Sequence, residues 1–296
     1  MQAAPHIPVL CREMVHAVAP VAQEVIVDGT FGAGGYTRAL LNAAPCARVI
    51  AFDRDPNVKL LADALARDFP GRFLFIGARF SAMVEALAAV GVTAVNAVVL
   101  DLGVSSMQLD EAARGFSFQK SAALDMRMGD TGPTAADVVN GYEEAALVRM
   151  LRDYGEERDA KRIARAIVAA RCVAPIVNTI QLADIVRGAV RGAARSKIHP
   201  ATRSFQALRV EVNAELAELE AALTAAGKLL APGGRLVVVT FHSLEDRIVK
   251  RFMQQHSGAL AAVSRHSPQA FAAQHSVQQN AFMLTPKHAI APHQEE

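Results

Sequence analysis

Short apolar runs alternate with segments of helical periodicity over the first hundred residues. The strands that this pattern predicts are 25–28, 48–53, 73–76 and 95–101. After the second strand, the apolar residues that recur at helical spacing are Val58, Leu61, Ala62 and Leu65. A βαβα order predicts a parallel sheet with helices on both faces, and it places ligand-facing residues at the carboxyl ends of the strands.

The pattern changes after Asp101. From about residue 107 to 205 there is no convincing strand, and helical periodicity predicts helices at 143–153, 158–172 and 179–194. A long helix is then predicted from about 205 to 230, and a buried strand at 235–241 resumes the sheet. The sequence therefore predicts an α/β fold whose Rossmann-like sheet is interrupted by an inserted helical domain.

Four parts follow from these changes. The first and third form one sheet domain, the second is the helical insertion, and the last is rich in Ala, Gln, His and Ser. We expect this last part to be poorly ordered because its periodicity is weak. The predicted bounds are 1–106, 107–204, 205–256 and 257–296.

Composition favours a protein of the cytoplasm. Although 52% of the 296 residues are hydrophobic, no apolar run reaches the roughly 18 residues that span a bilayer. The first residues lack the pattern of a signal peptide, so we expect no membrane association. Cys11, Cys46 and Cys172 lie far apart, which fits reduced thiols and predicts no metal site.

The net charge of +2 does not by itself indicate a nucleic-acid-binding protein. Residues 155–209, however, carry eleven Lys or Arg against four Asp or Glu, an excess of +7. This basic block can meet phosphate groups. A solvated helical surface can carry the same charge without any partner, and both interpretations stay open.

A glycine-rich loop follows the first predicted strand, and Asp53 ends the second. This arrangement is typical of a nucleoside-binding sheet, in which the acid holds a ribose hydroxyl. The pattern G-x-G-x-x-G fails, because Thr37 or Phe31 stands where a glycine is required. The spacing therefore disfavours an NAD-linked oxidoreductase and favours a ligand without a pyrophosphate, such as S-adenosylmethionine. A plain tight turn is the structural alternative.

Polar residues also follow the fourth strand. Asp101, Ser105, Ser106 and Gln108 place a carboxylate, two hydroxyls and an amide after this strand, beside the expected reactive end of the ligand. The structural alternative is a polar turn in which a serine caps a helix.

Three further segments carry candidate RNA contacts. Arg127 follows the aromatic pair of Arg114–Phe118 and can hold a phosphate, while the aromatic rings can stack on a base or simply belong to the core. Arg203 lies in a basic segment at a helix start, and His242 leaves the last strand just before Ser243 and Asp246, which resemble a capping box.

Jointly, these segments resemble the MraW family of S-adenosylmethionine-dependent methyltransferases, over most of the chain from His6 to about Phe252. The motifs that carry the resemblance are L-D-L-G-V-S-S-x-Q-L-D at 100–110, R-G-F-S-F at 114–118, L-D-M-R-M at 124–128, Y-G-E-E at 154–157 and F-H-S-L-E-D-R-I-V-K at 241–250. The family has a class I methyltransferase sheet with an inserted helical domain, in agreement with the pattern above.

The resemblance implies methylation of a cytosine N4 amino group in the decoding region of 16S ribosomal RNA, free or in the small subunit. The residues that it implies as cofactor contacts are Gly34, Gly35, Tyr36, Asp53, Phe80, Asp101 and Gln108. Asp101 is the first candidate for an acceptor near the amine, supported by Ser105 and Ser106. The D/N-P-P-Y loop of better-known amino-methyltransferases is absent, and D-L-G-V stands in its place.

Two departures from the family pattern affect these expectations. The family usually has histidine where Tyr36 stands. Leu284–Lys287 resembles the approach to the family's basic C-terminal segment, which is missing here, so we expect a weaker sheet edge and weaker RNA affinity. The alternative function is therefore a non-catalytic RNA-binding ribosome assembly factor that retains the fold. A homodimer is a further possible arrangement.

Overall fold

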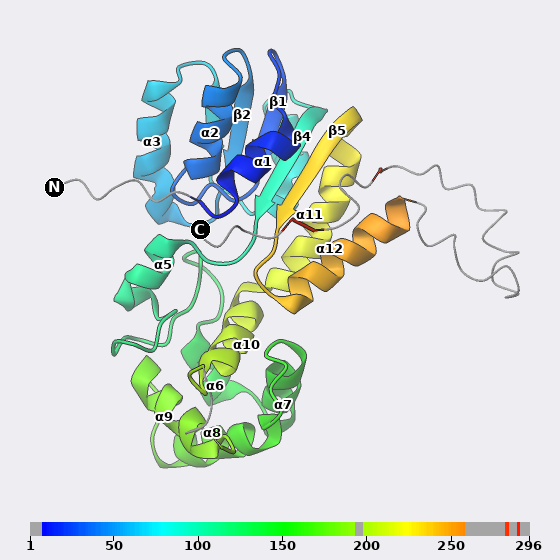
Figure 1. Cartoon of the computed structure of the whole chain (residues 1–296). Coiled ribbons are helices and arrows are strands. Elements are labelled where there is room, and N and C mark those ends of the chain that lie inside the picture. Colours follow the sequence, from blue (N-terminus) through cyan, green and yellow to red (C-terminus); the bar gives the residue numbers. More distant parts are fainter. Residues whose placement is uncertain (1–7, 193–197, 258–281, 284–288, 291–296) are drawn as a thin grey trace, which may run out of the picture. The chain divides into compact units, whose positions relative to one another are not determined.

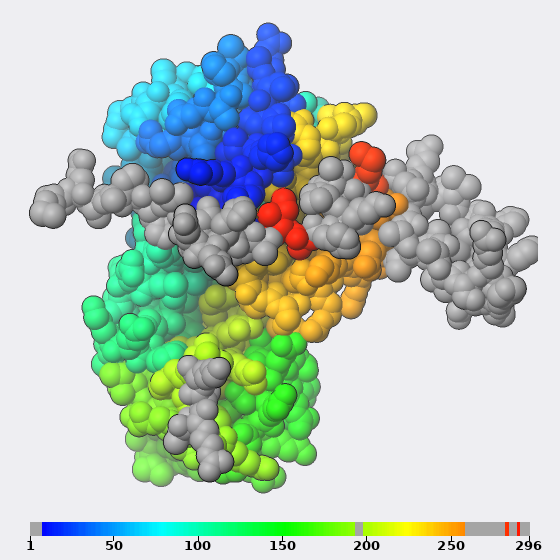
Figure 2. Space-filling view, in the orientation of Figure 1, coloured from blue at the N-terminus to red at the C-terminus, as the bar shows by residue number. Residues whose placement is uncertain are grey.

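A computed structural model describes residues 8–192, 198–257, 282–283 and 289–290, which are the coloured parts of Figures 1 and 2. Two compact units divide the chain. The sheet unit comprises Met1–Asp53, Asn57–Leu102 and Glu218–Glu296, and the helical unit comprises Arg54–Pro56 and Gly103–Ala217. The predicted insertion, 107–204, lies within the helical unit.

The sheet unit contains five parallel strands in the order β3-β2-β1-β4-β5 (Figure 1). Their bounds are β1 Val25–Asp28, β2 Arg48–Phe52, β3 Phe73–Ile76, β4 Val95–Asp101 and β5 Leu230–Val239. β1 lies at the centre and pairs with β2 on one side and β4 on the other. The predicted parallel Rossmann-like sheet is confirmed, because all carboxyl ends meet at one edge.

Apolar residues on both faces of this sheet are buried. Val27, Val98 and Leu100 face a core built with α4 and α11, while Ile26 and Val49 alternate to the opposite face and are 0% exposed. Figure 1 shows the group of α1, α2 and α3 and the group of α11 and α12 on different sides of the strands. The helix bounds are α1 Cys11–Val18, α2 Gly35–Ala43, α3 Lys59–Asp68, α4 Met83–Ala89, α11 Glu215–Leu229 and α12 Ser243–His256.

The helical unit has its own core, in which Leu147, Ile163 and Leu182 come from three successive helices and are 0% exposed. Its helices are α5 Ser106–Asp110, α6 Ala135–Gly141, α7 Glu144–Asp153, α8 Ala160–Val173, α9 Thr179–Ala189 and α10 Thr202–Asn213. Among its described residues, β pairing is limited to an isolated bridge between Ala123 and Asn178. The predicted helical character of this region is therefore confirmed.

The prediction of one long helix from 205 to 230 was wrong, because Ala214 has a left-handed backbone with φ 51° and separates α10 from α11. The preceding Asn213 is buried. Its amide donates to the carbonyl of Met126 at 2.7 Å and accepts the N–H of Met128 at 2.8 Å. These bonds to a distant loop fix the end of α10, a tertiary effect that helical periodicity does not contain.

Two other predictions concern the end of the chain. The last strand begins at Leu230, earlier than predicted, and includes Pro232-Gly233-Gly234 beside a register irregularity between Val95 and Ala97. The predicted poorly ordered tail and the segment Leu284–Lys287 lie almost wholly outside the described residues. Within the described ranges, no helix is long and apolar enough to cross a bilayer.

Arg235 of β5 fastens this edge strand to the start of the sheet unit. Its guanidinium donates to both carboxylate oxygens of Glu24, at 2.7 and 2.6 Å, and to the carbonyl of Val18 at 2.7 Å. The bond from Arg235 holds the pKa of Glu24 below its usual value, against the effect of burial. The ion pair therefore stabilises the fold at pH values above the usual pKa of a glutamate. This stabilisation is lost as the pH falls through the lowered pKa of Glu24.

We predict that Arg235→Met lowers the free energy of unfolding by about 1–3 kcal/mol, because the nearly buried Glu24 loses its charged partner. Urea unfolding at neutral pH measures this change. Arg38→Met is the matched control, since the Arg38–Asp68 pair is about half exposed and should matter by less than about 1 kcal/mol. Equal losses in the two variants would contradict the role of Arg235.

Candidate functional site

The glycine-rich loop lies across the carboxyl edge of the sheet unit, where it is bonded to two strands. The N–H of Gly29 donates to the carbonyl of Val99 at 2.8 Å, and the N–H of Phe31 donates to the carbonyl of Phe52 at 2.8 Å. The side chain of Thr30 accepts the N–H of Asp101 at 2.7 Å. The loop thus has a fixed course over the ends of β2 and β4.

Packing explains why two of the predicted cofactor contacts are glycines. Gly34 has φ 79°, and a Cβ there would lie 2.9 Å from the ring of Phe31. A Cβ on Gly35 would lie 2.3 Å from the ring of Pro8. Tyr36 is 3% exposed, and its hydroxyl donates to the carbonyl of Val9. The side chain of Tyr36 therefore packs inside the unit, and the backbone of the first turn of α2 is the part that can meet a ligand.

Asp53 and Phe80 follow β2 and β3 at the same edge. One carboxylate oxygen of Asp53 accepts the N–H of Gly32 at 2.8 Å, so the loop orients this acid. Phe80 is half-buried and lies close to the loop, since a Cβ added to Gly29 would be 3.2 Å from the Cβ of Phe80. The structure thus brings two of the predicted cofactor contacts, the carboxylate of Asp53 and the residue Phe80, to the glycine-rich loop.

Two acids at the centre of the edge are unusually hard to ionise. Burial raises the pKa of Asp28 to about 6, although the hydroxyl of Thr37 donates to it at 2.6 Å. Burial is the largest cause, and repulsion from Asp28 and Glu245 the smaller one, of the raised pKa of Asp101, which is about 7. Oδ1 of Asp101 is buried and accepts no hydrogen bond from any described residue. A cationic or N–H-bearing ligand would satisfy this oxygen, so the edge fits such a group.

The side-chain amide of Gln108, by contrast, is already hydrogen-bonded within the helical unit. Its Oε1 accepts the N–H of Ser105 at 3.0 Å, and its Nε2 donates to Asp55 at 2.8 Å. Ser105 accepts the N–H of Gln108 in return, which completes a capping box at the start of α5. The alternative of a serine cap was therefore correct for Ser105, while Ser106 is half-buried in the first turn.

A buried acid, Asp55, organises this part of the helical unit and was not predicted. It is 2% exposed and pairs with Arg114 at 2.8 Å, and Arg114 also donates to the carbonyls of Arg127 and Met128. The sequence feature that could have indicated Asp55 is its position two residues after Asp53, the acid that ends the second predicted strand. The pattern of a strand followed by an acid was assigned to Asp53 alone.

The predicted RNA contacts of the helical unit differ in their surroundings. Both ends of the Arg127 guanidinium bond to Asp125, at 2.9 and 2.7 Å, so an acid already neutralises this cation. Arg203 is exposed near the start of α10. Arg203 therefore remains accessible to a phosphate, whereas Arg127 orders its own loop.

His242 caps α12 in the sheet unit. Its Nδ1 accepts the N–H of Glu245 at 3.5 Å, and Glu245 accepts the N–H groups of Phe241 and His242 at 2.8 and 3.3 Å. The predicted capping box thus exists, but it is formed by His242 with Glu245, not by Ser243 with Asp246. Nε2 of His242 is buried and forms no hydrogen bond within the described part of the chain.

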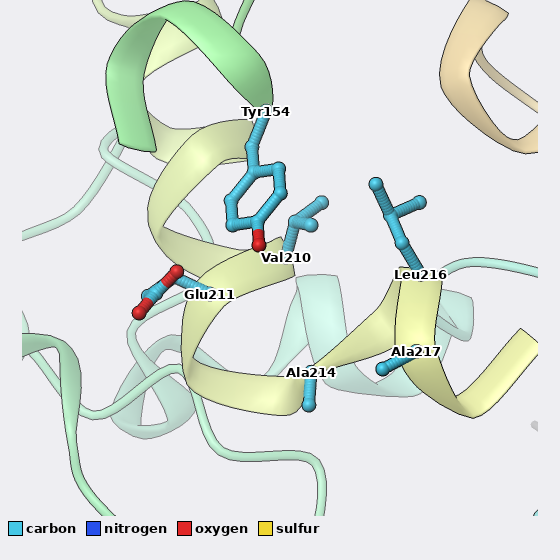
Figure 3. Close-up of a pocket in the computed structure, with 6 residues that line it drawn as sticks. All are labelled: Tyr154, Val210, Glu211, Ala214, Leu216 and Ala217. Carbon is cyan, nitrogen blue, oxygen red and sulfur yellow. The ribbon is translucent and has the colours of Figure 1, made fainter. Parts of the chain in front are cut away.

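A pocket of about 170 Å³ lies in the helical unit. Figure 3 shows Tyr154 and Glu211 on one side of the pocket and Leu216 and Ala217 on the other. Glu211 accepts the hydroxyl of Tyr142 at 2.7 Å, and this bond raises the pKa of Tyr142 to about 12. The pocket contains none of the residues that were predicted for the site.

Comparison with known proteins identifies the family. Residues 3–296 match the MraW methylase family. The chain belongs to this family. A relative named ribosomal RNA small subunit methyltransferase H, from Caulobacter vibrioides, is 53% identical over 296 residues, which are 100% of this chain and 91% of the relative. A relative of the same name from Acidiphilium cryptum is 56% identical over 269 residues, or 91% of this chain and 85% of that protein.

Solved structures resemble the MraW methylase over shorter stretches. A putative methyltransferase from Streptococcus mutans, solved in complex with SAH, is 14% identical with a TM-score of 0.29, covering 40% of this chain and 72% of that one. An rRNA methylase from Streptococcus thermophilus is 17% identical with a TM-score of 0.27, and the match covers 41% of this chain and 72% of that one. The family assignment confirms the predicted cofactor, S-adenosylmethionine.

We predict that Asp53→Ala weakens binding of S-adenosylmethionine by about 1–3 kcal/mol, the scale of a lost hydrogen bond to a charged group. Calorimetry measures this loss. Asp63→Ala is the control, because Asp63 is an exposed acid of α3 that pairs only with Lys59 in the described structure. Unchanged affinity in Asp53→Ala would refute the ribose role.

Proposed function

We propose that this MraW methylase transfers a methyl group from S-adenosylmethionine to the N4 amino group of a cytosine in the decoding region of 16S ribosomal RNA. Methylation of small-subunit ribosomal RNA follows from the family and from the names of the full-length relatives. The choice of an amino group rests on one observation above all, the buried and unpaired Oδ1 of Asp101 at the end of β4.

The chemistry requires an acceptor of this kind. S-adenosylmethionine supplies an activated methyl group on a sulfonium ion, and sulfur keeps the electron pair of the broken S–C bond. The lone pair of cytosine N4 is delocalised into the ring, so the protein must orient the amine. Asp101 accepts one N–H of the amine, frees the lone pair for attack, and takes the proton released when the N–C bond forms. Positioning supplies much of the remaining rate.

The other residues of the sheet unit hold the cofactor in this proposal. The backbone of Gly34, Gly35 and Tyr36 meets the methionine part, Asp53 takes the ribose hydroxyls, and Phe80 packs on adenine. Each lies at the carboxyl edge of the sheet unit or in the first turn of α2. Ser105, Ser106 and Gln108 act through the capped segment that follows Asp101, because two of these side chains are engaged in its capping box.

The helical unit is the substrate-recognition domain in this proposal. Its basic block from 155 to 209, including the exposed Arg203, meets the phosphates of the RNA. A cytosine amine must be unpaired to react, so the RNA presents an extruded or single-stranded base. Arg127 contributes by ordering the 124–128 loop through Asp125.

We predict that the protein incorporates tritiated methyl groups from S-adenosylmethionine into small ribosomal subunits that lack the modification. Nucleoside analysis should identify the product as N4-methylcytidine. Asp101→Asn should lower kcat by about 10²-fold or more, the usual scale of general-base catalysis. Binding of RNA and cofactor without any transfer by the wild type would favour the non-catalytic assembly factor.

A second prediction concerns pH. Asp101 ionises only above about pH 7 in the free protein, so a cation beside it is favoured as the pH rises. We expect the affinity for S-adenosylmethionine, divided by that for the neutral-sulfur product S-adenosylhomocysteine, to increase through this range. One released proton limits the slope to about tenfold per pH unit.

Calorimetry between about pH 5.5 and 8 measures this ratio, with the pKa of Asp101 near the middle of the range. The pKa of Asp28 is about 6, so ionisation of Asp28 contributes to the lower part of the wild-type curve, and the charge of Glu245 also acts on Asp101. Asp101→Asn isolates the contribution of Asp101 and should flatten the upper part of the curve. Identical curves for the two proteins would contradict the placement of Asp101 beside the sulfonium.

A further inference from the structure

Phe241 is an exposed aromatic ring at the carboxyl edge of the sheet unit. Its exposed fraction is 55%, and among the described residues no other phenylalanine or tyrosine is exposed. Burying a phenylalanine side chain is worth about 1.5–3 kcal/mol, so a ring left in solvent is available for a ligand. The family motifs assigned no role to it.

The backbone that carries this ring is held in place. β5 ends at Val239, which is the register partner of Asp101, and Phe241 follows two residues later. The N–H groups of Phe241 and His242 both donate to one oxygen of Glu245, which is 2% exposed. The ring therefore starts from a rigid turn, and little backbone freedom is lost when a ligand binds.

Two unsatisfied polar atoms belong to the same part of the sheet unit. Oδ1 of Asp101 is a hydrogen-bond acceptor, and Nε2 of His242 is a donor in the neutral tautomer whose Nδ1 accepts the N–H of Glu245. Nε2 lies 3.1 Å from Glu245 but lacks the geometry of a hydrogen bond. Glu245 is also close enough to Asp101 to repel its charge.

These features match one chemical class of ligand. A cytosine carries an amine that donates, ring atoms N3 and O2 that accept, and a flat π-face. We propose that Phe241 is the stacking surface for the target base, with the N–H of its amine on Asp101 and its acceptor edge on His242. This inference rests on the proposed function, since it names the residue that positions the cytosine.

Methyl transfer to small subunits that lack the modification tests the proposal. Stacking on an aromatic ring is worth about 1–3 kcal/mol per base, so Phe241→Ala should lower kcat/KM about 5- to 150-fold. Phe241→Tyr should stay close to the wild type, because the π-face remains. Phe241→Leu should resemble Phe241→Ala, because apolar bulk alone does not stack.

Binding of S-adenosylmethionine and the melting temperature should stay unchanged in all three variants, which separates stacking from a structural role. Leu60→Ala is the control, since Leu60 is an 80% exposed apolar residue of α3. Wild-type kcat/KM in Phe241→Ala, or in Phe241→Leu, would overturn the proposal. Absence of transfer by the wild type would instead contradict the proposed function.

If the wild type transfers no methyl group, a binding measurement still tests whether Phe241 stacks on a base. The chain contains no tryptophan, so Phe241→Trp introduces a single fluorescent reporter at the ring position. We expect an oligocytidine RNA to quench this fluorescence in the presence of S-adenosylhomocysteine, and Leu60→Trp to stay unquenched. Unchanged fluorescence at RNA concentrations that saturate binding would refute a stacking role for Phe241.

Discussion

Parallel strands bring their carboxyl ends to one edge of a sheet, and in this protein three of those ends carry acids, Asp28, Asp53 and Asp101. Burial is the main cause of the raised pKa values of Asp28 and Asp101, and repulsion adds to it, from Asp53 on Asp28 and from Asp28 on Asp101. Within the described residues, hydrogen bonds compensate Asp28 and Asp53, while Oδ1 of Asp101 has none. A ligand that brings positive charge would relieve this repulsion, which supports our proposal that the sulfonium of the cofactor lies at this edge.

The strands and the edge could be predicted from the sequence. Short apolar runs predicted β1 to β4, and the acids at or after the ends of β1, β2 and β4 lie at the edge where we propose the site. The direction of individual side chains could not be predicted. Tyr36 lies in the loop that was assigned to the cofactor, yet its ring is buried and its hydroxyl bonds to Val9. Loop spacing predicts which backbone can approach a ligand, but packing decides where a side chain points.

Tertiary hydrogen bonds account for most of what could not be predicted. Asn213 ends α10 through bonds to a distant loop, and Asp55 binds both Gln108 and Arg114. No local pattern announces a partner 50 or more residues away in the chain. The same bonds show that the helical unit is not a simple insertion. Excision of 103–217 would separate Asp55 from Gln108 and Arg114, to which it is bonded within the same compact unit.

The position of β5 in the chain also has a consequence for biosynthesis. β4 ends at Asp101, but its neighbour β5 begins at Leu230, so a ribosome must synthesise the whole helical unit before β4 is covered. A nascent chain therefore carries an open strand edge, the kind of surface that chaperones protect from misassembly. Asp101 is the register partner of Val239, so the burial that raises the pKa of Asp101 is completed only after β5 has been synthesised.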